Sequence, residues 1–158
     1  MTSKLFTIRC ENQKGMLNRI LSVFERPNYG ILSINQSVTD INGIILIIIE
    51  SKIPAAKAEV LLTKIECIVG VIDLVISYGD FLRSAFFQLS AKGLNDELWK
   101  LIGAHGASLV SMSENTLLIQ KSGKIGELNN LYRVLQSEGL MGACLTPIPV
   151  NEEGLLSV

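Results

Sequence analysis

The residues best suited to binding chemistry form one short turn, Asn12-Gln13-Lys14-Gly15, between an apolar alternating segment and a segment of helical periodicity. The side-chain oxygen of Asn12 can cap a helix start, and Gly15 lets the backbone come close to a ligand. Free N–H groups at the first turn of a helix favour an anion, such as the carboxylate of an amino acid. The turn therefore predicts an anion-binding site.

No other stretch has the spacing of a catalytic motif. The sequence contains no nucleophile elbow, zinc-ligand pattern, P-loop or dinucleotide fingerprint. Lys92-Gly93 and Ser122-Gly123-Lys124 lack the full glycine spacing of a phosphate loop, so we predict that they only begin helices.

Three cysteines, Cys10, Cys67 and Cys144, stand at distant positions in apolar surroundings, which predicts buried free thiols. The single histidine, His105, has no Cys or His beside it, so we predict no metal site. A nucleophile pair of Cys10 or Cys144 with His105 could arise only through tertiary proximity. We therefore predict a protein that is not an enzyme and has no catalytic residues and no cofactor.

The composition provides enough apolar residues for a core and for an interface. Apolar residues make up 48% of the 158 residues and charged residues 18%, which is enough for a core and favours an oligomer. The longest apolar run, residues 44–49, is too short to cross a bilayer, so no membrane association is expected. The first residues lead into a strand pattern without an export signal, and we predict a cytoplasmic location.

The first half of the chain has the order β-α-β-β-α-β. Strand patterns cover residues 5–11, 31–39, 44–50 and 70–77, with a half-buried alternation in the first. Two apolar stripes at helical spacing lie between them, at Leu17, Ile20, Leu21 and Phe24 and at Ala58, Leu61, Leu62 and Ile65. This order predicts an α+β, ferredoxin-like domain, an antiparallel sheet with both helices on one face.

The second half repeats the order after a linker at residues 78–80. Strand patterns cover residues 86–91, 107–112, 116–121 and 140–146, and helices follow Gly93 and Lys124. We therefore predict two tandem ferredoxin-like domains, residues 1–79 and 80–158, the second ending in a loosely ordered tail from Pro147.

A ferredoxin-like sheet can also bind RNA, but this sequence does not favour nucleic acid. RNA-recognition domains stack bases on aromatic residues of the first and third strands, and both third strands here lack any aromatic residue. The net charge is −1 and no basic run occurs.

Taken together, the turn, helix and second strand resemble the ACT domain of a known family, the small regulatory subunit of acetolactate synthase. The family pattern Glu-Asn-x-x-Gly-x-Leu-x-Arg is similar to the stretch from Glu11 to Arg19. The resemblance continues through Phe24, Arg26, Tyr29, Ile31 and the segment Val38-Thr39-Asp40. It extends to the second repeat, where Ser122-Gly123-Lys124 before a helix is similar to the family's C-terminal domain.

The resemblance implies a non-catalytic regulatory subunit of branched-chain amino-acid biosynthesis. Its partner would be the catalytic large subunit, a thiamine-diphosphate-dependent acetolactate synthase. Two ACT domains would pair across a homodimer, with a valine-type effector between the turn of one and the second strand of the other. The implied effector-binding residues are Asn12, Lys14, Gly15, Met16, Leu17, Asn28, Gly30 and Ile31.

One departure from the family pattern affects the effector site. The family's Gly-Tyr-Asn-Ile becomes Asn28-Tyr29-Gly30-Ile31, so Gly30 replaces a pocket asparagine. Either the turn is reshaped and Asn28 compensates, or the effector contact is lost, which would cost about 1.5–3 kcal/mol for a hydrogen bond to a charged ligand. A separate interpretation is that Gly30 is simply a turn residue. We predict weakened or altered feedback.

The alternative function is a free-standing tandem-ACT amino-acid sensor with an unrelated partner.

Overall fold

The structure is a computed structural model that describes residues 3–25, 28–148, 150–151 and 154–155. It contains two compact units, one with the residues up to Gly79 and one that runs from Asp80 to Ile148. Two short strands, β9 (Val150–Asn151) and β10 (Gly154–Leu155), pair with each other and group with the first unit. The rest of the tail that the sequence predicts to be loosely ordered, at 149, 152–153 and 156–158, lies outside the described residues.

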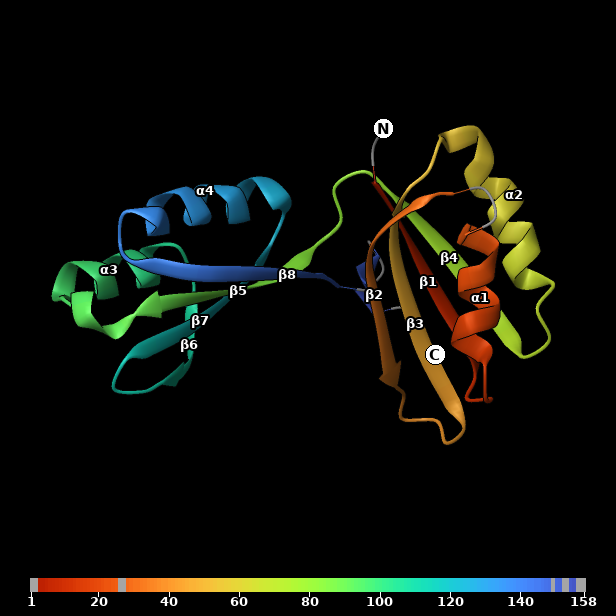
Figure 1. Cartoon of the computed structure of the whole chain (residues 1–158), viewed down its shortest axis with the longest axis horizontal. Coiled ribbons are helices and arrows are strands. Elements are labelled where there is room, and N and C mark those ends of the chain that lie inside the picture. Colours follow the sequence, from red (N-terminus) through yellow and green to blue (C-terminus); the bar gives the residue numbers. More distant parts are fainter. Residues whose placement is uncertain (1–2, 26–27, 149, 152–153, 156–158) are drawn as a thin grey trace. The chain divides into compact units, whose positions relative to one another are not determined.

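The first unit is a four-stranded antiparallel sheet with two helices on one face (Figure 1). The strand order is β2-β3-β1-β4, so β1 and β3 are central and β2 and β4 form the edges. The elements are β1 (Ser3–Glu11), α1 (Met16–Glu25), β2 (Gly30–Val38), β3 (Ile44–Lys52), α2 (Ala55–Glu66) and β4 (Val71–Tyr78).

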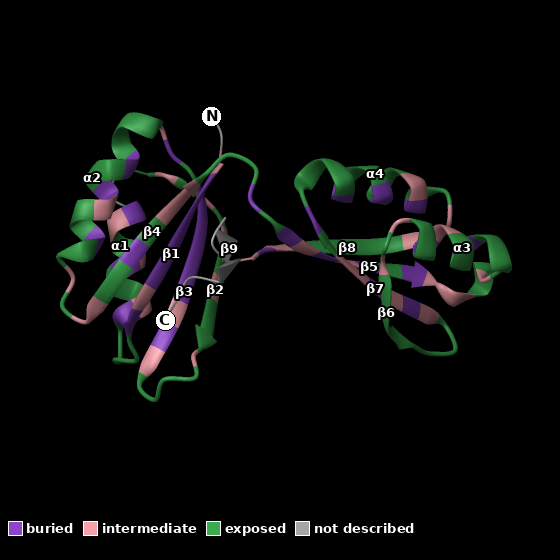
Figure 2. Ribbon diagram, turned by 180° about the vertical axis from the view of Figure 1, so that it is seen from behind, coloured by how far each residue is buried: buried purple, intermediate pink, exposed green. Residues whose placement is uncertain are grey.

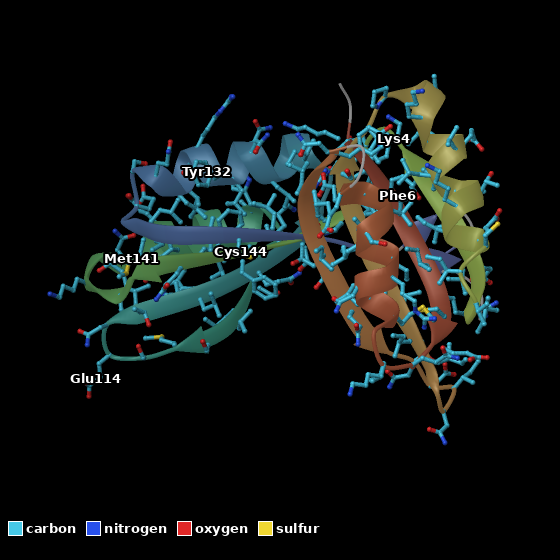
Figure 3. The ribbon with its side chains drawn as sticks, turned by 45° about the vertical axis from the view of Figure 1, so that its right-hand side comes forward. Lys4, Phe6, Glu114, Tyr132, Met141 and Cys144 are labelled. Carbon is cyan, nitrogen blue, oxygen red and sulfur yellow. The ribbon has the colours of Figure 1, made fainter. Side chains whose placement is uncertain are left out.

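The core of the first unit lies between the sheet and the helices, and Figure 2 shows the buried residues concentrated on β1 and β3. Phe6, which projects from β1 in Figure 3, meets Phe24 of α1 edge to face with ring centroids 5.2 Å apart. The half-buried alternation predicted for β1 is wrong, because Leu5 and Thr7 on the other face are buried as well. Their cross-strand neighbours on β3, Glu50 and Ile48, stand directly beside them and are buried too.

The ends of α1 are set by residues other than the predicted cap. The N–H of Arg19 donates to the carbonyl of Gly15 at 3.0 Å, so Gly15 and not Asn12 occupies the N-cap position. At the other end, Asn28 has φ +55° and donates to Glu25, while Tyr29 donates to Phe24. These two bonds form a Schellman motif with Asn28 as the left-handed residue. Pro27, the residue before Asn28, lies outside the described residues.

The second unit repeats the topology, with antiparallel strand order β6-β7-β5-β8. Asn95 accepts a bond from the N–H of Leu98 at 2.8 Å and so caps the first of its α-helices. The core includes Phe87, Leu98 and Leu131. The elements are β5 (Arg83–Ser90), the 3-10 turn η1 (Ala91–Gly93), α3 (Asp96–Ala104), β6 (Ser108–Met112), β7 (Thr116–Gly123), α4 (Ile125–Gln136) and β8 (Leu140–Pro147).

The predicted fold class, two tandem ferredoxin-like units of α+β type, is confirmed. The predicted burial of all three thiols is wrong, because only Cys10 is buried. Cys67 follows the last turn of α2, and Cys144 lies on the edge strand β8, where Figure 3 labels it. Within the described chain, no helix is both long enough and apolar enough to span a membrane.

Candidate functional site

The turn between β1 and α1 is held from two sides by backbone hydrogen bonds. The N–H of Glu11 donates to the carbonyl of Gly70, and the N–H of Asn12 donates to the carbonyl of Gly43, both at 2.8 Å. Gly15 then turns the chain into α1 with φ +80°, a left-handed conformation that disfavours other residues. Two neighbouring loops therefore fix the position at which α1 begins.

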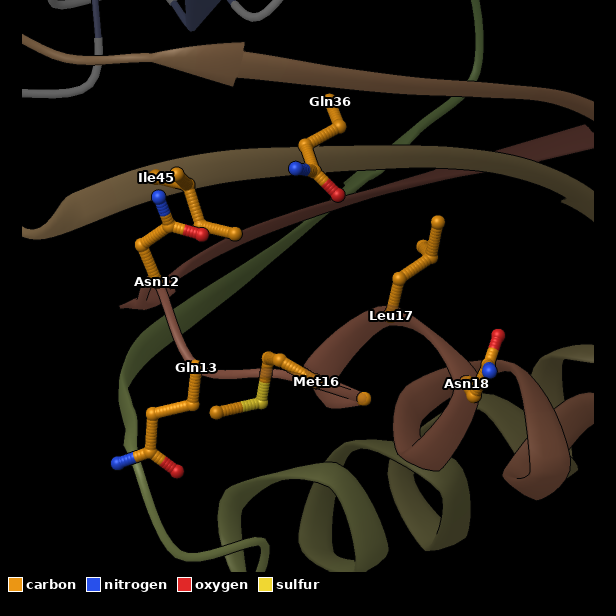
Figure 4. Close-up of a pocket in the computed structure, with 8 residues that line it drawn as sticks. Asn12, Gln13, Met16, Leu17, Asn18, Gln36 and Ile45 are labelled. Atoms are coloured by element: carbon orange, nitrogen blue, oxygen red, sulfur yellow. The ribbon is translucent and has the colours of Figure 1, made fainter.

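A hollow of about 200 Å³ opens beside this turn (Figure 4). Drug-sized ligands occupy pockets of roughly 300–1,000 Å³, so this one suits a smaller molecule. The first turn of α1 contributes the N–H groups of Leu17 and Asn18, for which a helix provides no acceptor of its own. The described residues that line the hollow are Asn12, Gln13, Gly15, Met16, Leu17, Asn18, Gln36 and Ile45.

The structure brings together only part of the predicted effector-binding set. Asn12, Gly15, Met16 and Leu17 line the hollow, whereas Lys14 is exposed on the turn and does not line it. Asn28, Gly30 and Ile31 lie just before or at the start of β2, whose other end is near the turn. The length of β2, about 25 Å, separates these two groups within one chain.

The departure at residues 28–30 now has a structural account. Asn28 serves the end of α1 through its left-handed backbone, as described above, so its position is explained without a ligand. Gly30 pairs with Lys52 as the first residue of β2, and its φ is not in the left-handed region. A Cβ added at Gly30 would meet nothing within 4 Å, so neither backbone strain nor crowding requires glycine there.

Four lining residues were not in the predicted effector-binding set: Gln13, Asn18, Gln36 and Ile45. Gln13 and Asn18 belong to the stretch that carries the family resemblance, so their proximity to the turn was a usable signal. Gln36 and Ile45 depend on the pairing of β2 with β3, which shifts register between Ile31 and Ser33. No local pattern in the sequence marks that shift.

Polar side chains connect the turn to the rest of α1. The Gln13 amide donates to the Glu11 carboxylate, and its oxygen accepts a bond from Nη2 of Arg19 at 3.0 Å. The same Nη2 lies 3.9 Å from the Met16 sulfur. Figure 4 shows Gln13 and Met16 on the opposite side of the turn from Asn12 and Ile45. Arg19 therefore contacts the side chains of two residues that line the hollow.

Neither the Cys10 thiol nor a cluster of metal ligands among the described residues supports catalysis at this site. Burial raises the pKa of the Cys10 thiol to about 11, although the positive charge of Arg19 opposes the shift. A nucleophilic thiolate is therefore scarce at neutral pH. In the part of the chain that the structure describes, no three His, Cys, Asp or Glu side chains gather as metal ligands would.

By its fold and its turn, the chain is a tandem ferredoxin-like protein with a polar hollow at the start of the first helix. No family model matches the sequence, and no curated protein matches it significantly. Among solved structures, the acetolactate synthase small subunit of Thermotoga maritima is similar, with a TM-score of 0.75 and 15% identity, over 93% of this chain and 94% of that chain.

The regulatory subunit of aspartate kinase from Thermus thermophilus, solved in a ligand-free form, is also similar. The TM-score is 0.50 and the identity 10%, over 87% of this chain and 92% of that chain. At such low identities the comparisons establish only the shared fold. Both similar proteins are named as subunits of enzymes, one as a small subunit and one as a regulatory subunit.

Proposed function

We propose that this chain is a non-catalytic regulatory subunit of acetolactate synthase that binds a branched-chain amino acid at the turn between β1 and α1. The observation that carries the proposal is the polar hollow at the start of α1, within a fold shared over nearly the whole chain with an acetolactate synthase small subunit. Catalysis would reside in a separate thiamine-diphosphate-dependent large subunit, and the location would be cytoplasmic.

The ligand chemistry follows from the groups around the hollow. The N–H groups of Leu17 and Asn18 would receive the carboxylate of the effector, because the positive end of the helix dipole lies there. The side-chain amides of Asn12 and Gln36 offer oxygens to the ammonium group. Ile45 and Leu17 supply apolar contacts that fit a valine-type side chain.

The proposal includes a homodimer, because one chain provides only part of the site. The edge strand β2 exposes large apolar side chains, with Leu32 50% and Val38 84% accessible. An unpaired apolar edge of this kind is a ready surface for a second copy. In such a dimer the partner's second strand would place its Gly30 and Ile31 near the turn, as the family resemblance implies.

The alternative is a free-standing amino-acid sensor with an unrelated partner. It is favoured by the similarity to the aspartate kinase regulatory subunit, because two such domains in tandem also occur beside a different enzyme. Partner identity, more than ligand identity, separates the two functions.

The test titrates the purified chain with valine, leucine and isoleucine by calorimetry, measures its mass in solution, and assays an acetolactate synthase large subunit with and without it. A dimer that binds one of the three and alters the activity of the large subunit is the expected result. Sub-micromolar valine binding would show that feedback is intact despite Gly30. A chain that binds an amino acid but neither associates with the large subunit nor alters its activity would support the alternative.

A further inference from the structure

A second hollow lies between the two helices of the first unit, which run over the same face of the sheet (Figure 1). Its volume is about 550 Å³, which exceeds that of the hollow at the turn. The described residues that line it, which we call the interhelix groove, are Arg19, Ser22 and Val23 of α1, Lys64 of α2, and Ile68 and Val69 of the loop after α2.

The interhelix groove combines positive charge with exposed apolar surface. Arg19 and Lys64 are both exposed, and none of the described lining residues is acidic. Val69 is 78% accessible, and the partly buried side chains of Val23 and Ile68 line the groove with it. Apolar contacts beside arginine are typical of protein interfaces, so this chemistry fits a protein segment better than a small polar ligand.

Arg19 is placed where the helix itself does not favour it. Arg19 lies four residues after the N-cap Gly15, so its positive charge is near the positive end of the α1 dipole. Lys64, in contrast, lies in the last turn of α2, where a cation balances the dipole. The position of Arg19 is therefore better explained by what it contacts, which includes Gln13 and Met16 at the turn.

We propose that the interhelix groove docks a segment of the catalytic partner protein that carries carboxylates beside apolar side chains. Complementary charge selects the carboxylates, and Val23, Ile68 and Val69 select their apolar neighbours. The proposal rests on the proposed function, since it concerns the same catalytic partner. It adds the surface at which that partner binds and the chemistry that the surface recognises.

The experiment measures the dissociation constant of the full chain for a purified acetolactate synthase large subunit by biolayer interferometry. The first variant is Lys64→Glu, and the second is Val69→Asp, which places a negative charge on the apolar rim. Lys100→Glu is the matched control, because it reverses the charge of another exposed lysine, on a helix of the other unit. Circular dichroism checks that all three variants fold.

We expect Lys64→Glu and Val69→Asp each to weaken binding by about tenfold or more and Lys100→Glu to change it less than twofold. Raising the salt concentration weakens binding of the unaltered chain more than that of Lys64→Glu. If the unaltered chain binds and neither groove variant differs from it, the groove proposal is wrong and the proposed function stands. If the unaltered chain does not bind the large subunit, both fail.

Discussion

Gly70 lies in the loop after α2 and contacts the turn at the candidate effector site, so replacing it by alanine tests that site. Its carbonyl accepts the N–H of Glu11, and its φ is +97°. A Cβ at this position would stand 2.6 Å from the terminal methyl of Met16, one of the residues that line the hollow. Gly70→Ala therefore disturbs both the backbone and the wall.

Gly70→Ala should affect both the stability of the fold and the affinity for the effector. A left-handed conformation costs a residue with a Cβ about 1–2 kcal/mol. Ordinary contacts begin at 3.4 Å, so the Met16 methyl must withdraw by about 0.8 Å. Because the methionine side chain is flexible, this movement adds little to the stability loss. Because Met16 is one of the residues that line the hollow, we expect its displacement to lower effector affinity about tenfold, comparable with the loss of one hydrogen bond.

Gly43→Ala is the matched control, since Gly43 has φ +79° but a Cβ there would meet nothing within 4 Å. Both variants should lower the melting temperature of the first unit by roughly 4–15 °C. Calorimetry with the tightest-binding of valine, leucine and isoleucine should separate them, with reduced affinity for Gly70→Ala alone. Equal affinity of the two folded variants would refute the assignment of Met16 to the site.

Three further predictions concern single residues. Gly30→Asn, which restores the family asparagine at an uncrowded position, should tighten effector binding by about ten- to hundredfold in calorimetry; an unchanged affinity in an intact dimer would exclude contact at this residue. Asn95→Ala removes the cap of α3 and should cost about 1 kcal/mol in thermal unfolding without altering effector affinity, and an unchanged melting temperature would contradict it. The pKa of Cys10 is raised by burial to about 11 from 9.0, so this thiol favours the folded state below pH 9 and that contribution is lost as the pH rises towards 11. A thiol reagent at pH 8 should therefore label Cys67 and Cys144 first, and rapid labelling of Cys10 in the folded chain would disprove its burial.

The sequence predicted the fold well because the fold depends on patterns that are local. Alternating apolar residues and stripes at helical spacing identified the eight strands of the two sheets and the four α-helices that the described residues form, and their order indicated one common topology. Burial was predicted less well, since it depends on neighbours that are distant in the sequence. Leu5 is buried in a central strand, and Cys67 and Cys144 are exposed although they were expected to be buried.

The candidate site was predicted only at the turn, where sequence neighbours are also spatial neighbours. Asn12 was expected to cap α1, but the left-handed Gly15 delays the helix start by three residues and leaves the Asn12 side chain at the hollow. Gln36 and Ile45 reach the hollow through sheet register, which has no local signature. Asn28 was assigned to the ligand, although its conformation ends a helix.

Arg19 physically connects the hollow at the turn with the interhelix groove. It lines the interhelix groove, and it contacts Gln13 and Met16, which line the hollow at the turn. A ligand that moves either side chain therefore acts on a cation of the groove, and any resulting change in partner affinity must be matched by an equal change in ligand affinity. Gly70→Ala pushes the same Met16 without any ligand. It should therefore alter binding of the large subunit as well, whereas Gly43→Ala should not.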